Sequence, residues 1–296
     1  MALTFDFAFE GFRTIRERPK LILFWGATAL FGNGLAVLVL VAFSGPALAT
    51  MISIGTKPVE EAFARQLLGE IMPGIGAWLP VQLLTLAVIN GAVCRAGLGE
   101  GDDRFGFLQF GFSEIRIFLL FVIRLILAVA ILFVTGVAIS AGAAVNPASE
   151  TTLQMAGLVA AFCAVMWLEV RLSLSVPQSF ATRRLDIFGS FALTRGRFWP
   201  LFWGYLAATG LGLCVTVLCS QIIEAILGVA FGTKAAEALP DMTSLQAFLT
   251  PQTLTDQCLF NGLAVPLVMA ILLGAPVAAY RALAPLPGPV TPDTKA

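Results

Sequence analysis

Six long apolar runs dominate the 296-residue chain and constrain its fold more than any other feature. Each run has 19 to 27 residues, and a helix needs roughly 20 apolar residues to cross a bilayer core about 30 Å thick. The sequence therefore predicts an all-α polytopic membrane helical bundle of six transmembrane helices, formed by residues 1–284 as a single domain. The spans are expected near residues 21–43, 75–93, 115–141, 153–176, 199–223 and 259–280. The Pro-rich residues 285–296 are expected to form a disordered or extended tail.

The composition excludes several kinds of chemistry. Charged residues make up only 12% of the chain, against about 25% in soluble domains. The chain has no histidine, which rules out Ser-His-Asp and Cys-His catalysis and histidine metal ligands. Its five cysteines form no CxxC pair, and its net charge is zero, so neither a zinc or redox motif nor a nucleic-acid-binding surface is indicated. We expect a protein that is not an enzyme and that uses no cofactor, no metal and no nucleic acid.

Positive charges are distributed unevenly between the two sides of the predicted bundle. Fourteen of the 18 Lys and Arg residues fall in the N-terminal segment, the second and fourth loops and the C-terminal tail, whereas three fall in the other loops. Positively charged loops stay on the cytoplasmic side of a membrane. The predicted location is the bacterial inner membrane, with both termini cytoplasmic. The first apolar run is too long for the core of a signal peptide, so we expect it to be retained as a span.

Amphipathic segments flank the predicted spans. A helix over about residues 3–18 would place Phe5, Ala8, Phe9, Phe12 and Ile15 on one arc. Such a helix lies in the membrane interface with its apolar face toward the lipid. A short helix on the outer membrane face is likewise expected within residues 57–72.

The N-terminal pattern recurs about 100 residues later. Phe5, Phe7, Gly11, Phe12, Ile15 and Arg16 match Phe105, Phe107, Gly111, Phe112, Ile115 and Arg116, and a looser third copy begins near Phe188. The pattern predicts a three-fold internal repeat of an interfacial helix followed by a transmembrane hairpin, an arrangement known in transporters. The alternative is coincidence, because interfacial helices commonly contain Phe and Arg.

Ionisable residues inside the predicted spans are candidate site residues. Arg124 lies in the third span, and Glu169 lies in the fourth, close to Arg171. Adjacent antiparallel helices would bring Arg124 and Glu169 to similar depths. Charged groups in a membrane are costly and need partners, so the pair is either a structural ion pair or a substrate or proton-coupling site.

Small residues recur every fourth position along the fifth span, at Gly204, Ala208 and Gly212. Small residues at this spacing let membrane helices approach closely. The stripe is expected to pack within the bundle; a homodimer face is the alternative.

The fourth loop carries a motif that resembles a known family. The stretch from Arg171 to Pro177 (RLSLSVP), followed by SFALTRGRFW over residues 190–199, is similar to a signature of bacterial six-helix membrane proteins. That family includes the membrane domain attached to some glycerophosphodiester phosphodiesterases. The resemblance implies a six-span fold and an inner-membrane location. It implies no catalysis, because the catalytic part of those enzymes is a separate soluble domain that this chain lacks.

The same motif has a physical interpretation. Pro177 is expected to end the fourth span, since it cannot extend the helical hydrogen-bond ladder. Seven arginines on the predicted cytoplasmic side are candidate contacts for lipid headgroups: Arg13, Arg16, Arg116, Arg183, Arg184, Arg195 and Arg197. The favoured function is a non-enzymatic membrane module that organises membrane lipid or binds a protein partner. The alternative is a small transporter or channel that uses the Arg124/Glu169 pair.

Overall fold

The computed structural model describes residues 5–55, 57, 59–99, 104–146, 149–232 and 240–284. Six helical segments of 33 to 38 residues are long and apolar enough to cross a membrane, and the described residues contain no strand. The predicted all-α, six-span fold is therefore confirmed, and the chain is a multi-pass membrane protein. The segments are α2 (Lys20–Ile54), α3 (Glu61–Leu98), α4 (Phe112–Val145), α5 with α6 (Glu150–Leu172, Ser175–Thr182), α8 (Phe198–Phe231), and α11, η3 and α12 (Pro251–Leu259, Phe260–Ala264, Val265–Leu283).

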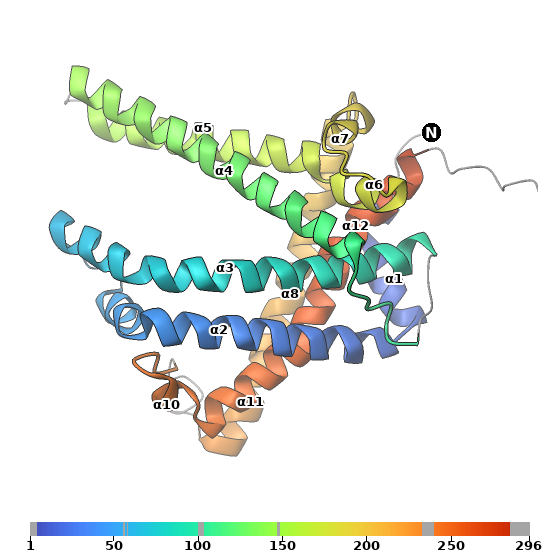
Figure 1. The fold of residues 1–296 in the computed structure, drawn as a ribbon, viewed down its shortest axis with the longest axis horizontal. Coiled ribbons are helices and arrows are strands. Elements are labelled where there is room, and N and C mark those ends of the chain that lie inside the picture. The colour runs from blue at the N-terminus through green and yellow to red at the C-terminus, as the bar shows by residue number, and fades with distance from the viewer. Residues whose placement is uncertain are drawn as a thin grey trace, which may run out of the picture.

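Consecutive long helices form three antiparallel hairpins, which meet at one end of the molecule (Figure 1). The described ends of the chain, the short helices α6 and α7 (Phe188–Leu193) and the start of α4 all lie at this end. From there the α4–α5 hairpin diverges from the α2–α3 hairpin, while α8 and α12 cross behind them (Figure 1). The divergence leaves space for a cavity near the point where the hairpins meet.

The helices are longer than the apolar runs predicted. Residues 57–72 do not hold a separate helix on the outer face, because α3 starts at Glu61 and continues through Pro73 and Pro80. Ser44 explains part of this continuity. Its hydroxyl accepts from the Gly74 amide and donates to the Glu70 carbonyl, both at 3.0 Å. It therefore links an amide and a carbonyl four residues apart in the turn of α3 that contains Pro73. Neighbouring Ser side chains can satisfy the backbone groups that a membrane proline frees.

The fourth segment also differs from the prediction. Pro177 does not end it: α5 ends at Leu172, and Pro177 lies in the first turn of α6. A proline is tolerated there because its missing N–H would have no helical partner. The hydroxyls of Ser173 and Ser175 donate to the Val170 and Leu172 carbonyls at 2.8 and 2.6 Å, which satisfies carbonyls freed at the break.

The N-terminal segment packs one of its sides against the rest of the bundle. It forms η1 (Phe5–Phe9) and α1 (Glu10–Glu17). Phe7 and Ala8 are buried in a cluster with residues of α8 and α12, and Gly11 lies so close to α12 that an added Cβ would be 2.3 Å from the Ala270 carbonyl oxygen. Phe9 and Phe12 of the predicted lipid-facing arc are 55% and 39% exposed, so both remain free to contact lipid. Ala8 of the same arc does not, because it is buried against α8 and α12.

The second copy of the repeat forms no interfacial helix. Gly106 and Phe107 have φ values of 64° and 61°, so they form a turn, and Gly111 is the N-cap of α4. Only a six-residue helix, α7, occurs at the third copy. The recurring sequence thus precedes a long helix each time, but its local structure is not repeated.

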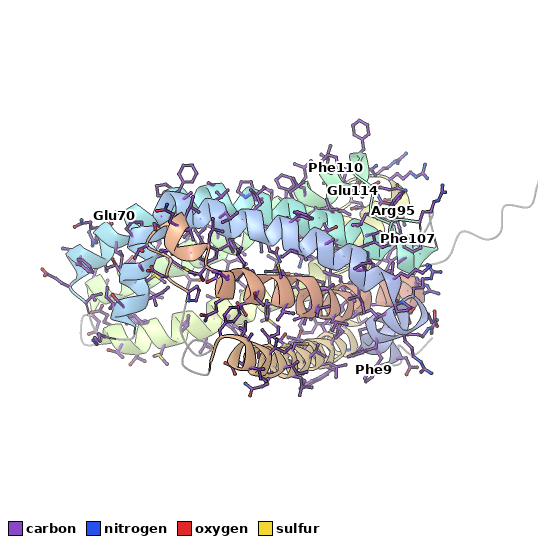
Figure 2. All side chains as sticks on the ribbon, turned by 90° about the horizontal axis from the view of Figure 1, so that it is seen from below. Phe9, Glu70, Arg95, Phe107, Phe110 and Glu114 are labelled. Atoms are coloured by element: carbon purple, nitrogen blue, oxygen red, sulfur yellow. The ribbon has the colours of Figure 1, made fainter. Side chains whose placement is uncertain are left out.

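A buried ion pair holds the start of α4 against the end of α3. Arg95 and Glu114 pair with 7% and 0% of their side chains exposed. Arg95 also donates to the Phe107 carbonyl at 3.0 Å, and the second carboxylate oxygen of Glu114 accepts from the Gly111 amide at 2.8 Å. The guanidinium lies 5.5 Å from the centre of the Phe180 ring. Figure 2 shows Arg95, Glu114 and Phe107 together at one end of the bundle.

We predict that Glu114→Gln destabilises the protein by about 3 kcal/mol or more, because it leaves the Arg95 charge buried without a counter-charge. The midpoint of thermal unfolding in detergent should fall by several degrees. The control is Glu61→Gln, which breaks the exposed Arg65–Glu61 pair and should change stability by less than about 1 kcal/mol. Equal midpoints for the two variants would contradict this assignment.

Two glycines of α2 provide a matched pair for a second prediction. A Cβ on Gly26 would lie 2.1 Å from the Gly262 carbonyl oxygen, whereas a Cβ on Gly34 would have no neighbour within 4 Å. Gly26→Ala should therefore cost about 1–3 kcal/mol by overpacking. Gly34→Ala should be neutral or stabilising by up to about 1 kcal/mol, because alanine is the better helix former. The same thermal assay measures both, and a Gly26→Ala variant as stable as Gly34→Ala would refute the close contact.

Candidate functional site

A cavity of about 350 Å³ lies where the three hairpins converge. Its wall is drawn from α3, α4, α5, α6, α8 and α12 and is largely apolar, with one ion pair and a few hydroxyl and amide groups. The lining residues are Leu86, Asn90, Phe121, Arg124, Met166, Glu169, Val170, Ser173, Val176, Pro177, Tyr205, Ala208, Thr209, Leu272, Leu273 and Pro276. Membrane-protein ligands commonly bind in such sites between helices.

The structure brings Arg124 and Glu169 together in this cavity. The Arg124 guanidinium donates to the Glu169 carboxylate. Arg124 lies 12 residues after the start of α4, which is about 18 Å along the helix axis. The pair is not sealed, because 21% of the Arg124 side chain and 37% of the Glu169 side chain remain exposed. An ion pair at this depth is costly unless its charges are compensated and hydrogen-bonded.

Tyr205 of α8 adds an uncommitted hydroxyl to the cavity. Its hydroxyl oxygen is buried and has no hydrogen-bond partner among the described residues. The Ser173 hydroxyl, which lines the same cavity and lies near the Tyr205 hydroxyl, donates its own hydrogen to the Val170 carbonyl. The Tyr205 ring packs edge-on against Phe7, with centroids 5.8 Å apart, so the N-terminal segment fixes its position. A buried polar group without a partner is rare in proteins and calls for an explanation.

Arg171 does not join the Arg124–Glu169 pair, although sequence proximity grouped it with them. Its guanidinium lies over the Trp167 ring at 5.6 Å and donates to the Thr194 hydroxyl at 3.4 Å. The Ser190 hydroxyl donates to the Arg171 carbonyl at 2.6 Å. Arg171 therefore connects α5 to α7, and the motif that carries the family resemblance forms this connection.

The seven arginines predicted to contact headgroups all lie at the end where the hairpins meet, on α1, on α4 and in the segments on either side of α7 (Figure 1). Five of them are exposed: Arg13, Arg16, Arg183, Arg184 and Arg195. Exposed aromatic rings accompany them, among them Phe188 at 82% and Trp199 at 64% exposure. Arginines and aromatic rings together are typical of the boundary between hydrocarbon and headgroups.

The stripe of small residues on α8 is covered by the same chain. A Cβ on Gly204 would lie 1.9 Å from the Phe7 ring, and one on Gly212 would lie 3.4 Å from Leu272. Ala208 is 2% exposed. The stripe thus packs inside the bundle, and these three positions do not present a free homodimer face.

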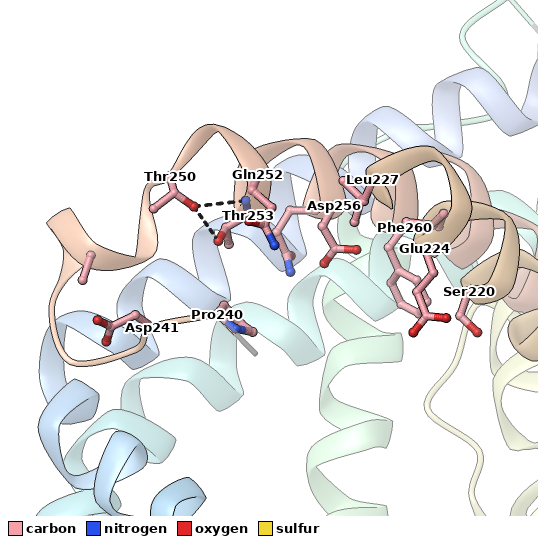
Figure 3. Close-up of a pocket in the computed structure, with 13 residues that line it drawn as sticks. Ser220, Glu224, Leu227, Pro240, Asp241, Thr250, Gln252, Thr253, Asp256 and Phe260 are labelled. Atoms are coloured by element: carbon pink, nitrogen blue, oxygen red, sulfur yellow. Dashed lines mark hydrogen bonds between the residues drawn. The ribbon is translucent and has the colours of Figure 1, made fainter. Parts of the chain in front are cut away.

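Two features were missed by the sequence analysis. One is the Arg95–Glu114 pair, whose arginine was counted only as a topology signal. The other is a cavity of about 610 Å³ at the opposite end of α8, lined by Glu224, Asp241 and Asp256 (Figure 3). Hydrogen bonds from Thr243 lower the pKa of Asp241. The excess of acidic residues in the predicted outer loops was the available signal for this cavity.

A chain of polar side chains leads from this second cavity into the bundle. Gln257, in the cavity wall, accepts from the Asn261 amide at 2.8 Å, and Asn261 accepts from Asn33 of α2 at 2.9 Å. Asn261 lies in η3, a π-helical turn, and such turns are frequent at functional sites. Among the described residues, no three His, Cys, Asp or Glu side chains come close enough to hold a metal ion.

We predict that exchanging the charges of the Arg124–Glu169 pair restores the yield of folded protein that either single substitution reduces. Arg124→Glu and Glu169→Arg each place two like charges together within the membrane, so each should reduce the yield of folded protein severely. The double variant restores opposite charges on the same two helices. It should recover at least half of the wild-type monodisperse peak in size-exclusion chromatography. A double variant no better than the worse single variant would show that the two side chains do not pair.

Comparison of the chain with models of protein families, with curated proteins and with solved structures gives no match.

Proposed function

We propose that the protein is a non-enzymatic membrane protein that binds a membrane lipid in the cavity beside Arg124 and Glu169. The observation that carries the proposal is the composition of that cavity. A partly exposed ion pair and an unpartnered tyrosine hydroxyl lie in a largely apolar wall at membrane depth. An amphipathic molecule would supply polar partners to the ion pair and the hydroxyl, and apolar contacts to the rest of the wall.

The seven arginines at the end where the hairpins meet have a supporting role. Each arginine near anionic headgroups contributes about 1 kcal/mol to membrane attachment. Their positive charge favours a cytoplasmic location for both termini in a bacterial inner membrane. The resemblance to the six-helix family fits the same location. A protein partner or a second copy would have to use a surface other than the stripe on α8.

Transport is the second candidate, and one observation favours it. The cavity beside Arg124 (the inner cavity) and the cavity beside Glu224 (the outer cavity) both lie along α8. Thr209 is in the wall of the inner cavity, and Ser220 is in the wall of the outer cavity. Between them Gly212 faces Leu272 and Val268, at 3.4 and 3.7 Å from the position of an added Cβ. A separation of α8 from α12 at this point would join the two cavities into one path along α8, as conduction through a channel requires.

Two neighbouring alanines of α8 test the lipid-binding proposal. Ala208 lines the cavity, whereas Ala207 is exposed on the same helix. Ala208→Leu places three more carbons at the cavity wall and should displace the ligand, and Ala207→Leu should not. Native mass spectrometry of gently extracted protein measures the lipid retained, with a monodisperse chromatographic peak required of both variants. We expect wild type and Ala207→Leu to retain one lipid and Ala208→Leu to lose it.

Equal lipid retention in all three proteins would contradict binding in this cavity. Solute movement across proteoliposomes that Ala208→Leu abolishes and Ala207→Leu preserves would favour transport instead.

A further inference from the structure

We propose that the ligand of the inner cavity is a zwitterionic phospholipid with a primary ammonium group, whose phosphate binds Arg124 and Tyr205 and whose ammonium binds Glu169. This inference rests on the proposed function and specifies its ligand. Phosphatidylethanolamine has this headgroup chemistry.

The charge of the cavity wall is the first argument. Among its lining residues only Arg124 and Glu169 are charged, so the wall as a whole is neutral. A lipid with net negative charge would satisfy the guanidinium but leave its own excess charge beside the carboxylate. Uncompensated charge within a membrane protein costs several kcal/mol. A zwitterion with adjacent opposite charges leaves the site neutral.

The hydrogen-bonding capacity of the site is the second argument. A guanidinium has five N–H donors in a fork that matches phosphate, and the Arg124–Glu169 contact uses one nitrogen of it. The Tyr205 hydroxyl supplies another buried donor without an acceptor. A phosphate group offers acceptors to both, which also explains why a tyrosine hydroxyl is buried there without a partner.

Glu169 selects the other half of the headgroup. Its hydrogen bond from Arg124 involves one carboxylate oxygen, and an ionised carboxylate accepts several hydrogen bonds. A primary ammonium donates three, whereas a trimethylammonium group donates none and is recognised through aromatic cages. Phe121 and Tyr205 are the aromatic residues in the wall, which is too few to form such a cage. The carboxylate therefore favours ethanolamine over choline.

The dimensions and surroundings of the cavity fit a headgroup with its chains outside. A volume of about 350 Å³ accommodates a phosphoethanolamine headgroup but not two acyl chains. The chains need apolar surface nearby, and α5 carries exposed apolar side chains on the outer side of Glu169, including Leu158 at 63% and Phe162 at 65%. The partial exposure of Glu169 leaves the headgroup site open.

The test measures binding of three dioleoyl lipids, phosphatidylethanolamine, phosphatidylglycerol and phosphatidylcholine, to delipidated protein by native mass spectrometry. Wild type should retain the ethanolamine lipid at least about tenfold better than either of the others, which corresponds to about 1.4 kcal/mol. Glu169→Gln should reverse the preference toward phosphatidylglycerol, because Arg124 is then an unbalanced cation. Tyr205→Phe should weaken the binding of all three lipids about equally and leave the preference among them unchanged.

Two further variants keep the test decisive if Glu169→Gln folds poorly. The neutral double variant Arg124→Gln with Glu169→Gln contains no unbalanced charge and should bind the three lipids with no headgroup preference. Its control, Arg65→Gln with Glu61→Gln, removes the exposed pair of α3 and should retain the wild-type preference.

The outcomes separate this inference from the proposed function. Equal retention of the three lipids by wild type, lost in Ala208→Leu, would overturn the headgroup assignment and leave lipid binding intact. Retention of none of them, or retention unaffected by Ala208→Leu, would overturn both.

Discussion

The Arg95–Glu114 pair fixes how the α4–α5 hairpin joins the rest of the bundle. Both side chains are buried, and each has a partner besides the other. Arg95 donates to the Phe107 carbonyl, and Glu114 accepts from the Gly111 amide at the start of α4. A buried pair of this kind contributes less by its net energy than by the cost of any arrangement that separates it. Because Arg124 lies ten residues beyond Glu114 on the same helix, this pair also sets the depth and the orientation of the inner cavity.

Close backbone contacts hold the other hairpins together. Within a membrane, lipid is as apolar as a side chain, so helices associate through packing and polar contacts rather than through the hydrophobic effect. Glycine permits that packing where Gly26 meets Gly262 and where Gly11 meets Ala270. Both contacts involve the segment η3–α12, which places this last span at the centre of the bundle. The α4–α5 hairpin has no comparable backbone contact with α12 among the described residues, so it diverges, and the cavity forms at its base.

Hydropathy predicted the six spans because the bilayer imposes their length and apolar character. The pairing of Arg124 with Glu169 was predicted because the two residues lie at similar depths in consecutive antiparallel spans. The sequence did not predict the Arg95–Glu114 pair, since both residues lie near span ends, where charges ordinarily face water. It assigned Ala8 of the N-terminal helix to lipid, because amphipathicity identifies an apolar face but not which of its residues α12 covers. The predicted helices were too short, because a helix once formed continues through polar residues outside the hydrocarbon.

The Arg95–Glu114 and Arg124–Glu169 ion pairs differ in a way that bears on function. A pair that serves structure alone is expected to be enclosed and to have its hydrogen bonds satisfied, and Arg95–Glu114 meets both conditions. Arg124–Glu169 is not enclosed: its side chains are 21% and 37% exposed, and it lies in a cavity beside the Tyr205 hydroxyl, which has no hydrogen-bond partner among the described residues. The second pair retains the unused hydrogen-bonding capacity that a ligand requires, and its balanced charge favours a ligand that is itself balanced.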